Sequence, residues 1–258
     1  MIEFQQLSRA YGEFTALHPL TLTIARGEVF GFLGPNGAGK TTTIRMMMGI
    51  LVPTRGRALI QGLDCHAQRA EVQRHVGYLP DNPVYYDFLR GREILRFVAE
   101  MHGMPRAEAG KRAVAMLEEF GLTDVVDEFA VNYSMGMKKK LGLACALIHD
   151  PQVLILDEPI NGLDPRAARD VQDRLKQAAA AGKTIFMSTH LLDMAEKVCT
   201  RVGIIHKGSL VATGTMAELR ERVQRDAAAG GGQDASLEEV FLKVTDEGAS
   251  EPQPAATA

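Results

Sequence analysis

Apolar and polar residues follow the period of β-strands in the first third of this chain. Every second residue is apolar in residues 20–24, and a shorter apolar stretch occupies residues 58–60. A period of two is typical of strands that bury one face, so these segments predict an antiparallel layer. Residues 29–33 form an apolar run before a glycine-rich segment, which predicts a strand that ends in a loop.

A helical period replaces the strand period between about residues 87 and 148. Apolar side chains recur three or four positions apart in two groups. These are Phe88, Ile94, Leu95, Val98 and Met101 in the first group, and Ala113, Met116, Leu117 and Phe120 in the second. Gly121 directly follows the second group, as is common at helix ends. The pattern predicts a helical subdomain at about residues 87–148.

Short apolar runs return in the last part of the chain and alternate with helical segments. Strands are predicted at residues 153–156, 184–187 and 202–206, with helices at residues 166–180 and 191–200 between them. Such alternation is typical of a parallel sheet. We therefore expect an α/β fold that combines a mostly parallel sheet, an antiparallel β layer and an inserted helical subdomain.

Composition changes after about residue 225, so we expect one main domain over residues 1–225. Residues 226–235 are rich in Gly and Ala, which favours a flexible linker. A capping box then opens a short predicted helix over residues 236–245, whose apolar face is expected to dock on the body of the protein or on a second subunit. Residues 246–258 are predicted to be a disordered tail.

A phosphate-binding pattern follows the apolar run at residues 29–33. Residues 34–42 read Gly-Pro-Asn-Gly-Ala-Gly-Lys-Thr-Thr and fit G-x-x-x-x-G-K-[ST], between a predicted strand and a helix. In such a loop backbone N–H groups face the phosphates, Lys40 adds positive charge and the Thr41 hydroxyl can ligate Mg²⁺. The alternative, a glycine-rich turn, fits this context poorly. The residues predicted to contact the nucleotide here are Gly34, Pro35, Asn36, Gly37, Ala38, Gly39, Lys40, Thr41 and Thr42.

Two adjacent carboxylates, Asp157 and Glu158, follow the aliphatic residues 153–156. Four consecutive aliphatic residues indicate a strand buried on both faces, and ligands of open α/β sheets bind at the carboxyl ends of strands. Asp157 is then placed to hold Mg²⁺, and Glu158 to polarise an attacking water. Alone, Asp-Glu-Pro is equally compatible with a solvated strand end. Beside a phosphate-binding loop it indicates hydrolysis of a nucleoside triphosphate.

With these motifs the chain resembles, from about residue 2 to residue 244, the nucleotide-binding subunit of an ATP-binding cassette (ABC) transporter. Further motifs follow in that family's order: Tyr11, residues 133–137, residues 161–164 and His190. A lone tyrosine or histidine is more often a packing or surface residue, but six motifs in one order are specific. The resemblance implies that Tyr11 stacks on adenine, that residues 161–164 cross a dimer interface, and that His190 contacts the γ-phosphate and the catalytic glutamate.

The segment Tyr-Ser-Met-Gly-Met at residues 133–137 matches the family's signature segment. The resemblance implies that two subunits sandwich two ATP molecules head to tail, with Ser134 and Gly136 of one subunit closing on the γ-phosphate held by the other. A helix N-terminus is suited to phosphate, and Gly136 permits close approach. Residues 138–140 are three lysines, for which we favour a solvated helix face over added positive potential at the site.

Two motifs depart from the commoner pattern of the family. The usual signature is Leu-Ser-Gly-Gly-Gln, and the Tyr-Ser-x-Gly-Met form found here resembles ATPase subunits of bacterial drug, antibiotic and lipid exporters. Asp81 stands where the family usually carries Gln, whose side chain reaches the metal and the attacking water. Asp81 is shorter and charged, and is therefore a third candidate, after Thr41 and Asp157, for the metal shell.

Composition argues against several other classes of protein. The 258 residues, 46% of them apolar, suffice for one sizeable α/β core, and a net charge of −3 gives no electrostatic footprint for nucleic acid. Three widely spaced cysteines without a C-x-x-C pair argue against a disulfide or metal framework. The first residues lack the features of a secretory leader, and no uncharged apolar stretch reaches 18 residues, which predicts a cytoplasmic chain.

From the resemblance we expect an ATP-binding and ATP-hydrolysing motor subunit of an ABC transporter of the exporter type. The expected cofactors are ATP and Mg²⁺, and the expected partners are a second ATPase domain in a homodimer and integral membrane transporter subunits. The chain is then peripheral on the cytoplasmic face of the inner (cell) membrane. One rival is a soluble ABC ATPase acting on ribosomes or DNA, whose members usually carry two cassettes or a coiled-coil insertion. Another is a regulatory subunit without hydrolysis, against which Glu158 and His190 both count.

Overall fold

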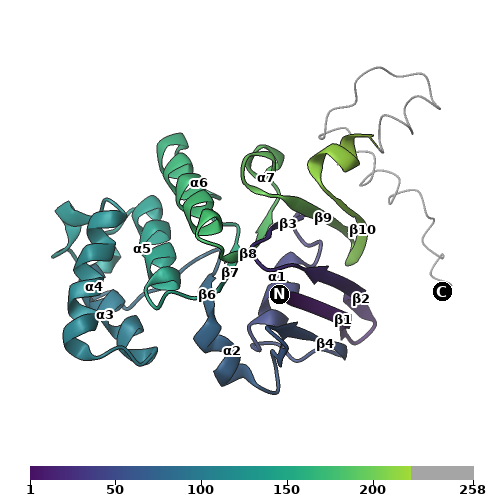
Figure 1. The fold of residues 1–258 in the computed structure, drawn as a ribbon, viewed down its shortest axis with the longest axis horizontal. Helices are drawn as coiled ribbons and strands as arrows, with labels where there is room; N and C mark the ends of the chain where they lie inside the picture. The colour runs from purple at the N-terminus through teal and green to yellow at the C-terminus, as the bar shows by residue number, and fades with distance from the viewer. Residues whose placement is uncertain (222–258) are drawn as a thin grey trace, which may run out of the picture.

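Two β-sheets lie at the centre of the computed structural model, which describes residues 1–221 (Figure 1). The smaller sheet is antiparallel, with strand order β2-β1-β4-β5. Its strands are β1 (Ile2–Tyr11), β2 (Phe14–Ile24), β4 (Arg55–Ile60) and β5 (Leu63–Asp64). The segments 20–24 and 58–60 lie in β2 and β4, so the predicted antiparallel layer is confirmed.

The larger sheet has the strand order β10-β9-β3-β8-β7-β6, and every neighbouring pair in it is parallel except β10 with β9. Its strands are β3 (Val29–Leu33), β6 (Val76–Leu79), β7 (Val153–Asp157), β8 (Thr184–Thr189), β9 (Arg201–His206) and β10 (Ser209–Gly214). Every residue of β3, β7 and β8 is buried, which confirms the mostly parallel core. The carboxyl ends of these three strands therefore meet at one edge of the sheet.

Helices cover the larger sheet and extend it at one end. They are α1 (Lys40–Met47), α2 (Arg69–His75), α3 (Gly91–Met101), α4 (Arg106–Glu119), α5 (Met135–Leu147), α6 (Pro165–Ala180) and α7 (Leu192–Val198), with short 3₁₀ turns at Thr123–Val125 and Ala130–Asn132. Figure 1 shows α3, α4 and α5 grouped at the end of the molecule opposite the antiparallel sheet, as the helical period predicted. Helix α7 is shorter than predicted, because Cys199 is extended and leads into β9.

An aromatic cluster joins the two sheets. The ring of Phe186 on β8 lies 6.0 Å from Phe4, 5.9 Å from Phe30 and 5.5 Å from Phe32, measured between ring centroids. All four side chains are fully buried, and aromatic rings at these separations attract one another in addition to the effect of burial. The cluster therefore fixes the antiparallel sheet, and the hairpin that carries Tyr11, against the larger sheet.

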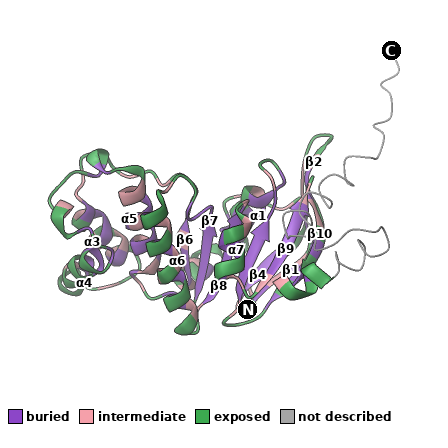
Figure 2. Ribbon diagram, turned by 90° about the horizontal axis from the view of Figure 1, so that it is seen from above, coloured by how far each residue is buried: buried purple, intermediate pink, exposed green. Residues whose placement is uncertain are grey.

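A second apolar core joins the sheet to the helical subdomain. Leu95, Leu117 and Leu141, from α3, α4 and α5, are at most 1% exposed, whereas the outer faces of the helices are exposed (Figure 2). At the junction, a Cβ atom on Gly77 of β6 would overlap the carbonyl oxygen of Ala146 on α5. Only glycine allows this contact between two backbones. Helix α5 is thus packed directly on the edge strand of the sheet.

Two stacked histidine rings lie at the same junction. The rings of His102, after α3, and His149, after α5, are 3.6 Å apart with planes at 9°. The Nε2 atom of His149 lies 3.2 Å from the Val76 carbonyl oxygen, which suits an Nε2–H donor. Burial, and then the neighbouring His102, lower the pKa of His149 to about 4. His149 is therefore neutral in the folded protein near pH 7.

We predict that His149 makes the folded state less stable as the pH falls from about 6.5 to about 4. The unfolded chain protonates His149 near pH 6.5, whereas the folded protein resists protonation until about pH 4. In that window the unfolded state binds more protons, so the free energy of unfolding decreases with falling pH. Urea unfolding of His149→Gln should show a shallower pH dependence than the native protein, whereas exposed His66→Gln should not. Equal slopes in all three proteins would contradict this assignment.

Candidate functional site

The phosphate-binding loop connects β3 to α1 at the carboxyl edge of the larger sheet. Gly39, directly before α1, has a φ of 106°, which is accessible to glycine but rarely to other residues. A Cβ atom at this position would also lie 2.6 Å from the Ala16 carbonyl oxygen on β2. The required glycine therefore lets the loop curl tightly between the two sheets, with the N-terminus of α1 facing the site.

Lys40 occupies the concave side of this loop. Its ammonium donates hydrogen bonds to the carbonyl oxygens of Gly34, at 2.6 Å, and Pro35, at 3.2 Å. The same nitrogen lies 3.2 Å from the Glu158 Oε1 atom, and the residue is 6% exposed. A buried ammonium with these partners keeps a positive charge at the position that the sequence motif assigns to the phosphates.

The two predicted carboxylates lie across the strand end from Ser188 on β8. Asp157 pairs with Ser188 in the parallel ladder, and the serine hydroxyl donates a 2.5 Å hydrogen bond to Asp157 Oδ1. Burial raises the pKa of Asp157, the carboxylates of Asp81 and Glu158 raise it further, and hydrogen bonds from Ser188 and Thr41 lower it. A buried carboxylate in such surroundings is one that a bound cation would stabilise.

Glu158 is held at several of its polar atoms. Its backbone N–H lies 3.0 Å from the Ser188 hydroxyl oxygen, and its Oε2 atom lies 3.0 Å from His190 Nδ1. Its φ of 47° lies in the left-handed region, where residues other than glycine are strained and often functional. The side chain is 9% exposed. The fold thus places a carboxylate between a lysine and a histidine, with little freedom to move.

Most of the predicted nucleotide residues share one pocket of about 500 Å³ with Glu158 and Asp81, whereas Gly34, Ala38, Asp157 and His190 do not line it. It is lined by Tyr11, Phe14, Ala16, Pro35, Asn36, Gly37, Gly39, Lys40, Thr41, Thr42, Asp81, Glu158 and Asn161. Phe14, which pairs with Tyr11 across the hairpin, was missed by the sequence analysis. The sequence signal that could have identified Phe14 is its aromatic ring close to Tyr11, on the other side of Gly12. The guanidinium of Arg9 lies 4.4 Å from the Tyr11 ring centroid and supports that ring by a cation–π contact.

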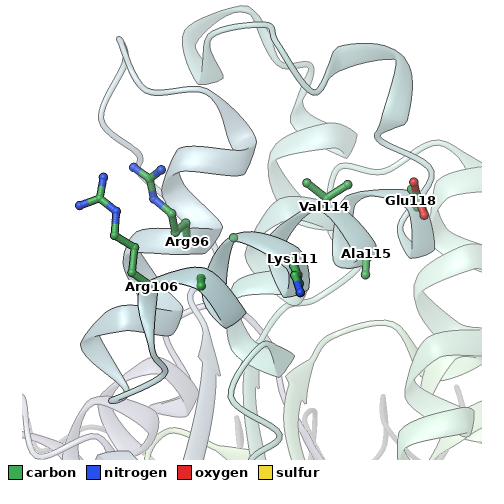
Figure 3. Close-up of a pocket in the computed structure, with 8 residues that line it drawn as sticks. Arg96, Arg106, Lys111, Val114, Ala115 and Glu118 are labelled. Carbon is green, nitrogen blue, oxygen red and sulfur yellow. The ribbon is translucent and has the colours of Figure 1, made fainter.

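A larger and shallower depression lies over α3 and α4, with Arg96, Arg106 and Lys111 on its rim (Figure 3). Its volume is about 950 Å³, but none of the predicted site residues lines it. We therefore assign nucleotide binding to the smaller pocket, in which the glycine-rich loop and the carboxylates meet.

The signature residues lie elsewhere on the surface. Ser134 caps α5, and its hydroxyl oxygen accepts a 3.2 Å hydrogen bond from the Met137 N–H. A Cβ atom on Gly136 would lie 3.9 Å from Leu163, so the signature lies beside the loop at residues 161–164. Neither Ser134 nor Gly136 lines the nucleotide pocket. The predicted site residues therefore form two separate groups on one chain.

The lysine run after the signature is not a uniformly solvated face. Lys140 forms a surface ion pair with Asp170, at 2.7 Å. Lys139, in contrast, is 1% exposed, so the expectation of a solvated face is wrong for this residue. Its ammonium donates to the Glu158 carbonyl oxygen at 2.5 Å and lies 3.4 Å from Asp81 Oδ1. Nothing in the pattern of residues 138–140 indicates that one of the three lysines turns inward.

A glycine-rich loop, a strand-end Asp-Glu pair and a histidine directly after the neighbouring strand lie together, as expected for a P-loop protein of the ATP-binding cassette class. The family model described as "ABC transporter" matches residues 17–161. The chain belongs to the ABC transporter family.

Two curated bacterial relatives and one solved structure give the same assignment. The probable multidrug ABC transporter ATP-binding protein YbhF of Escherichia coli is 35% identical over 95% of this chain, which spans only 41% of that relative's length. The linearmycin resistance ATP-binding protein LnrL of Bacillus subtilis is 34% identical over 88% of this chain and 73% of its own length. A solved ATP-binding subunit of an ABC transporter is 34% identical, with a TM-score of 0.84 over 95% of this chain and 99% of the other.

Within residues 1–221, no helix is both long and apolar enough to cross a membrane. Cys65, Cys145 and Cys199 are free. The predicted linker, short helix and tail at residues 226–258 lie outside the described residues.

We predict that Asp157→Asn stabilises the nucleotide-free protein while weakening its response to MgATP. The neutral amide removes a buried charge and can still accept the Ser188 hydroxyl bond. The melting temperature without ligand should rise by about 2–4 °C, which corresponds to roughly 1 kcal/mol. The added stabilisation by MgATP should shrink. Asp150→Asn is the matched control, since the pKa of Asp150 is lowered by a hydrogen bond from Lys183 and its removal should not stabilise the protein. A lower ligand-free melting temperature for Asp157→Asn would refute the prediction.

Proposed function

We propose that this chain is the ATP-hydrolysing motor of an ABC exporter, and that ATP turnover takes place in the pocket shared by Lys40 and Glu158. The observation that carries the proposal is the convergence of a phosphate-binding lysine, a buried aspartate and a glutamate–histidine pair at one strand edge. In the nucleotide-free geometry, Lys40 donates to carbonyl oxygens of its own loop. These are weak partners that β- and γ-phosphate oxygens would replace.

The residues around Asp157 fit a magnesium ion. Mg²⁺ is usually held by one or two carboxylates together with substrate phosphates, and Asp157 and Thr41 supply a buried carboxylate and a hydroxyl. Within residues 1–221 no group of three or more His, Cys, Asp and Glu side chains could hold a metal ion, which agrees with a site completed by ATP. When bound, Mg²⁺ would neutralise charge on the phosphates. Asp81 lines the pocket and is a further ligand candidate.

Glu158 is the proposed general base. Its carboxylate lies 3.0 Å from His190 Nδ1 and 3.2 Å from Lys40 Nζ, so its orientation is set before a nucleotide binds. A base held in this way can orient a water and accept its proton. His190 would then hold the carboxylate in line and contact the γ-phosphate. Tyr11, with Phe14 beside it, supplies the surface on which adenine stacks.

The signature group is proposed to complete the site of a second copy. Ser134 and Gly136 lie outside the pocket of their own chain, so they cannot close on ATP bound there without a large rearrangement. A head-to-tail homodimer places each signature on the other subunit's ATP, and two-fold symmetry then completes two identical sites. ATP binding would close this dimer and hydrolysis would reopen it.

An exporter role is supported by the signature form and by relatives named for multidrug transport and linearmycin resistance. We propose that a separate membrane subunit provides the path across the membrane. We propose that the chain is peripheral on the cytoplasmic face of the cell membrane. Its alternating binding and hydrolysis of ATP would drive conformational change in that separate subunit.

Three exposed apolar side chains mark the proposed contact with the membrane subunit. Val84, Tyr86 and Phe88, here called the linker surface, are 91%, 71% and 81% exposed. They lie between Asp81 and helix α3, so the segment connects the nucleotide pocket to the helical subdomain. Exposed apolar groups of this kind are typical of interaction sites. A helix of the membrane subunit seated here would be linked to the pocket by a few residues of chain.

We predict that Glu158→Gln retains ATP binding but lowers turnover by about 10²–10³-fold, since the amide cannot accept the proton of water. ATP should then trap a dimer that is visible by size-exclusion chromatography. Glu119→Gln, which removes a surface partner of Arg174, is the matched control and should turn over normally. Unchanged turnover in Glu158→Gln would remove Glu158 from the role of base.

We also predict that the tagged chain co-purifies with a multi-span membrane protein from detergent-solubilised membranes, in near-equal amounts by mass spectrometry. Phe88→Glu should reduce this recovery at least tenfold, because it places a charge in an apolar contact. Ile50→Glu, at another exposed apolar position, is the control. Recovery with ribosomes, with DNA or alone would contradict the transporter assignment. Equal recovery of both variants would remove the linker surface from the contact.

A further inference from the structure

Lys139 is a buried cation that the proposed mechanism does not use. It lies within α5, five residues after Ser134, or about 7.5 Å along the helix axis. Its ammonium donates to the Glu158 carbonyl oxygen at 2.5 Å and lies 3.4 Å from the Asp81 carboxylate. Lys139 therefore contacts both the backbone of Glu158, the proposed base, and Asp81, the candidate metal ligand that precedes the linker surface.

Burial of the Lys139 ammonium carries a desolvation penalty that an apolar side chain would not have. Burial lowers the pKa of Lys139, and Asp81, as the closest carboxylate, raises it. A methionine or leucine of similar volume would avoid the desolvation penalty, since replacing buried charges with apolar residues is often neutral or stabilising. The charge at this position therefore needs a reason other than packing.

The contact of Lys139 with the Glu158 carbonyl group can affect how the Glu158 carboxylate is oriented. Glu158 has a strained φ of 47°, and its N–H is held by Ser188 on one side of the residue. Lys139 holds the carbonyl group on the other side. The orientation of the carboxylate toward His190 thus depends on two anchors, one from the sheet and one from α5.

Helix α5 is also the element that carries the signature at its N-terminus. At the other end, it contacts β6 through the close approach of Gly77 to Ala146. A shift of α5 at the signature end would therefore pivot on β6 and displace Lys139, which lies between the two ends.

We propose that Lys139 is a positioning residue that couples the two ATP sites of the dimer. Engagement of Ser134 and Gly136 by the partner's ATP moves α5, and Lys139 transmits that movement to the Glu158 peptide and to Asp81 in its own site. This inference rests on the head-to-tail dimer proposed above. Hydrolysis in one site then depends on occupancy of the other, through a single buried ammonium.

The test compares Lys139→Met with Lys140→Met. The Lys140 variant also removes a positive charge from the same helix, but it breaks only a surface ion pair. We expect Lys139→Met to lower kcat about 10–100-fold, a magnitude typical of a misplaced catalytic group, with the ATP dissociation constant changed less than twofold. Lys139→Gln, whose amide can still donate to the Glu158 carbonyl, should recover part of kcat. Lys140→Met should turn over as the native protein does.

Two further measurements separate positioning from a simple loss of structure. In a Glu158→Gln background, Lys139→Met should still form the ATP-trapped dimer. Formation of the closed dimer does not need the Lys139 ammonium, whereas hydrolysis within the closed dimer does. Asp81→Asn and Lys139→Met should also be non-additive in kcat, since the two residues act through one contact. Loss of the trapped dimer together with a lowered melting temperature would overturn the proposal in favour of a structural role.

The outcome also distinguishes this inference from the proposed function. If the native protein hydrolyses ATP and Glu158→Gln does not, the site assignment stands whatever Lys139 does. If Lys139→Met then turns over like Lys140→Met, the coupling role alone is refuted. If neither the native protein nor Lys140→Met hydrolyses ATP, the proposed function itself fails.

Discussion

The parallel pairing of β7 with β8 is the constraint on which the whole site depends. Its register places Asp157 opposite Ser188, so that one hydroxyl donates to Asp157 and faces the Glu158 N–H. Two residues further along, His190 reaches the Glu158 carboxylate. A slip of one residue would turn each of these side chains to the opposite face of the sheet. Burial of every residue in both strands makes such a slip unfavourable.

Buried positive and negative side chains lie close together at the carboxyl edge of the larger sheet. Lys40 and Lys139 approach Glu158 from two directions, one at its carboxylate and the other at its peptide carbonyl. Asp157 has a raised pKa because it is buried beside other carboxylates. In the proposed function, phosphate oxygens and a cation pair with these buried groups.

The division of the candidate site residues into two groups is the basis of the proposed head-to-tail dimer. The phosphate-binding loop, Glu158 and Asp81 line one pocket, whereas Ser134 and Gly136 lie on another part of the surface beside the loop at residues 161–164. Helix α5 belongs to both groups, with the signature at its N-terminus and Lys139 at the pocket. The linker surface joins the same pocket to the helical subdomain. In the proposed assembly, contacts with the second copy and with the membrane subunit would both act on Glu158 and Asp81.

The sequence by itself determined the fold class and predicted which residues form the candidate nucleotide site. Period-two and aliphatic runs specify strands, and the spacing of Gly34, Lys40 and Thr41 is a local property of one loop. It did not determine which lysine of residues 138–140 is buried, that Phe14 lines the pocket, or that Ser188 holds both Asp157 and Glu158. These depend on contacts between segments distant in sequence, whose geometry is set by sheet register and helix packing. Only the tertiary structure decides them, because identical neighbours in sequence can face solvent or a carboxylate according to the helix face they occupy.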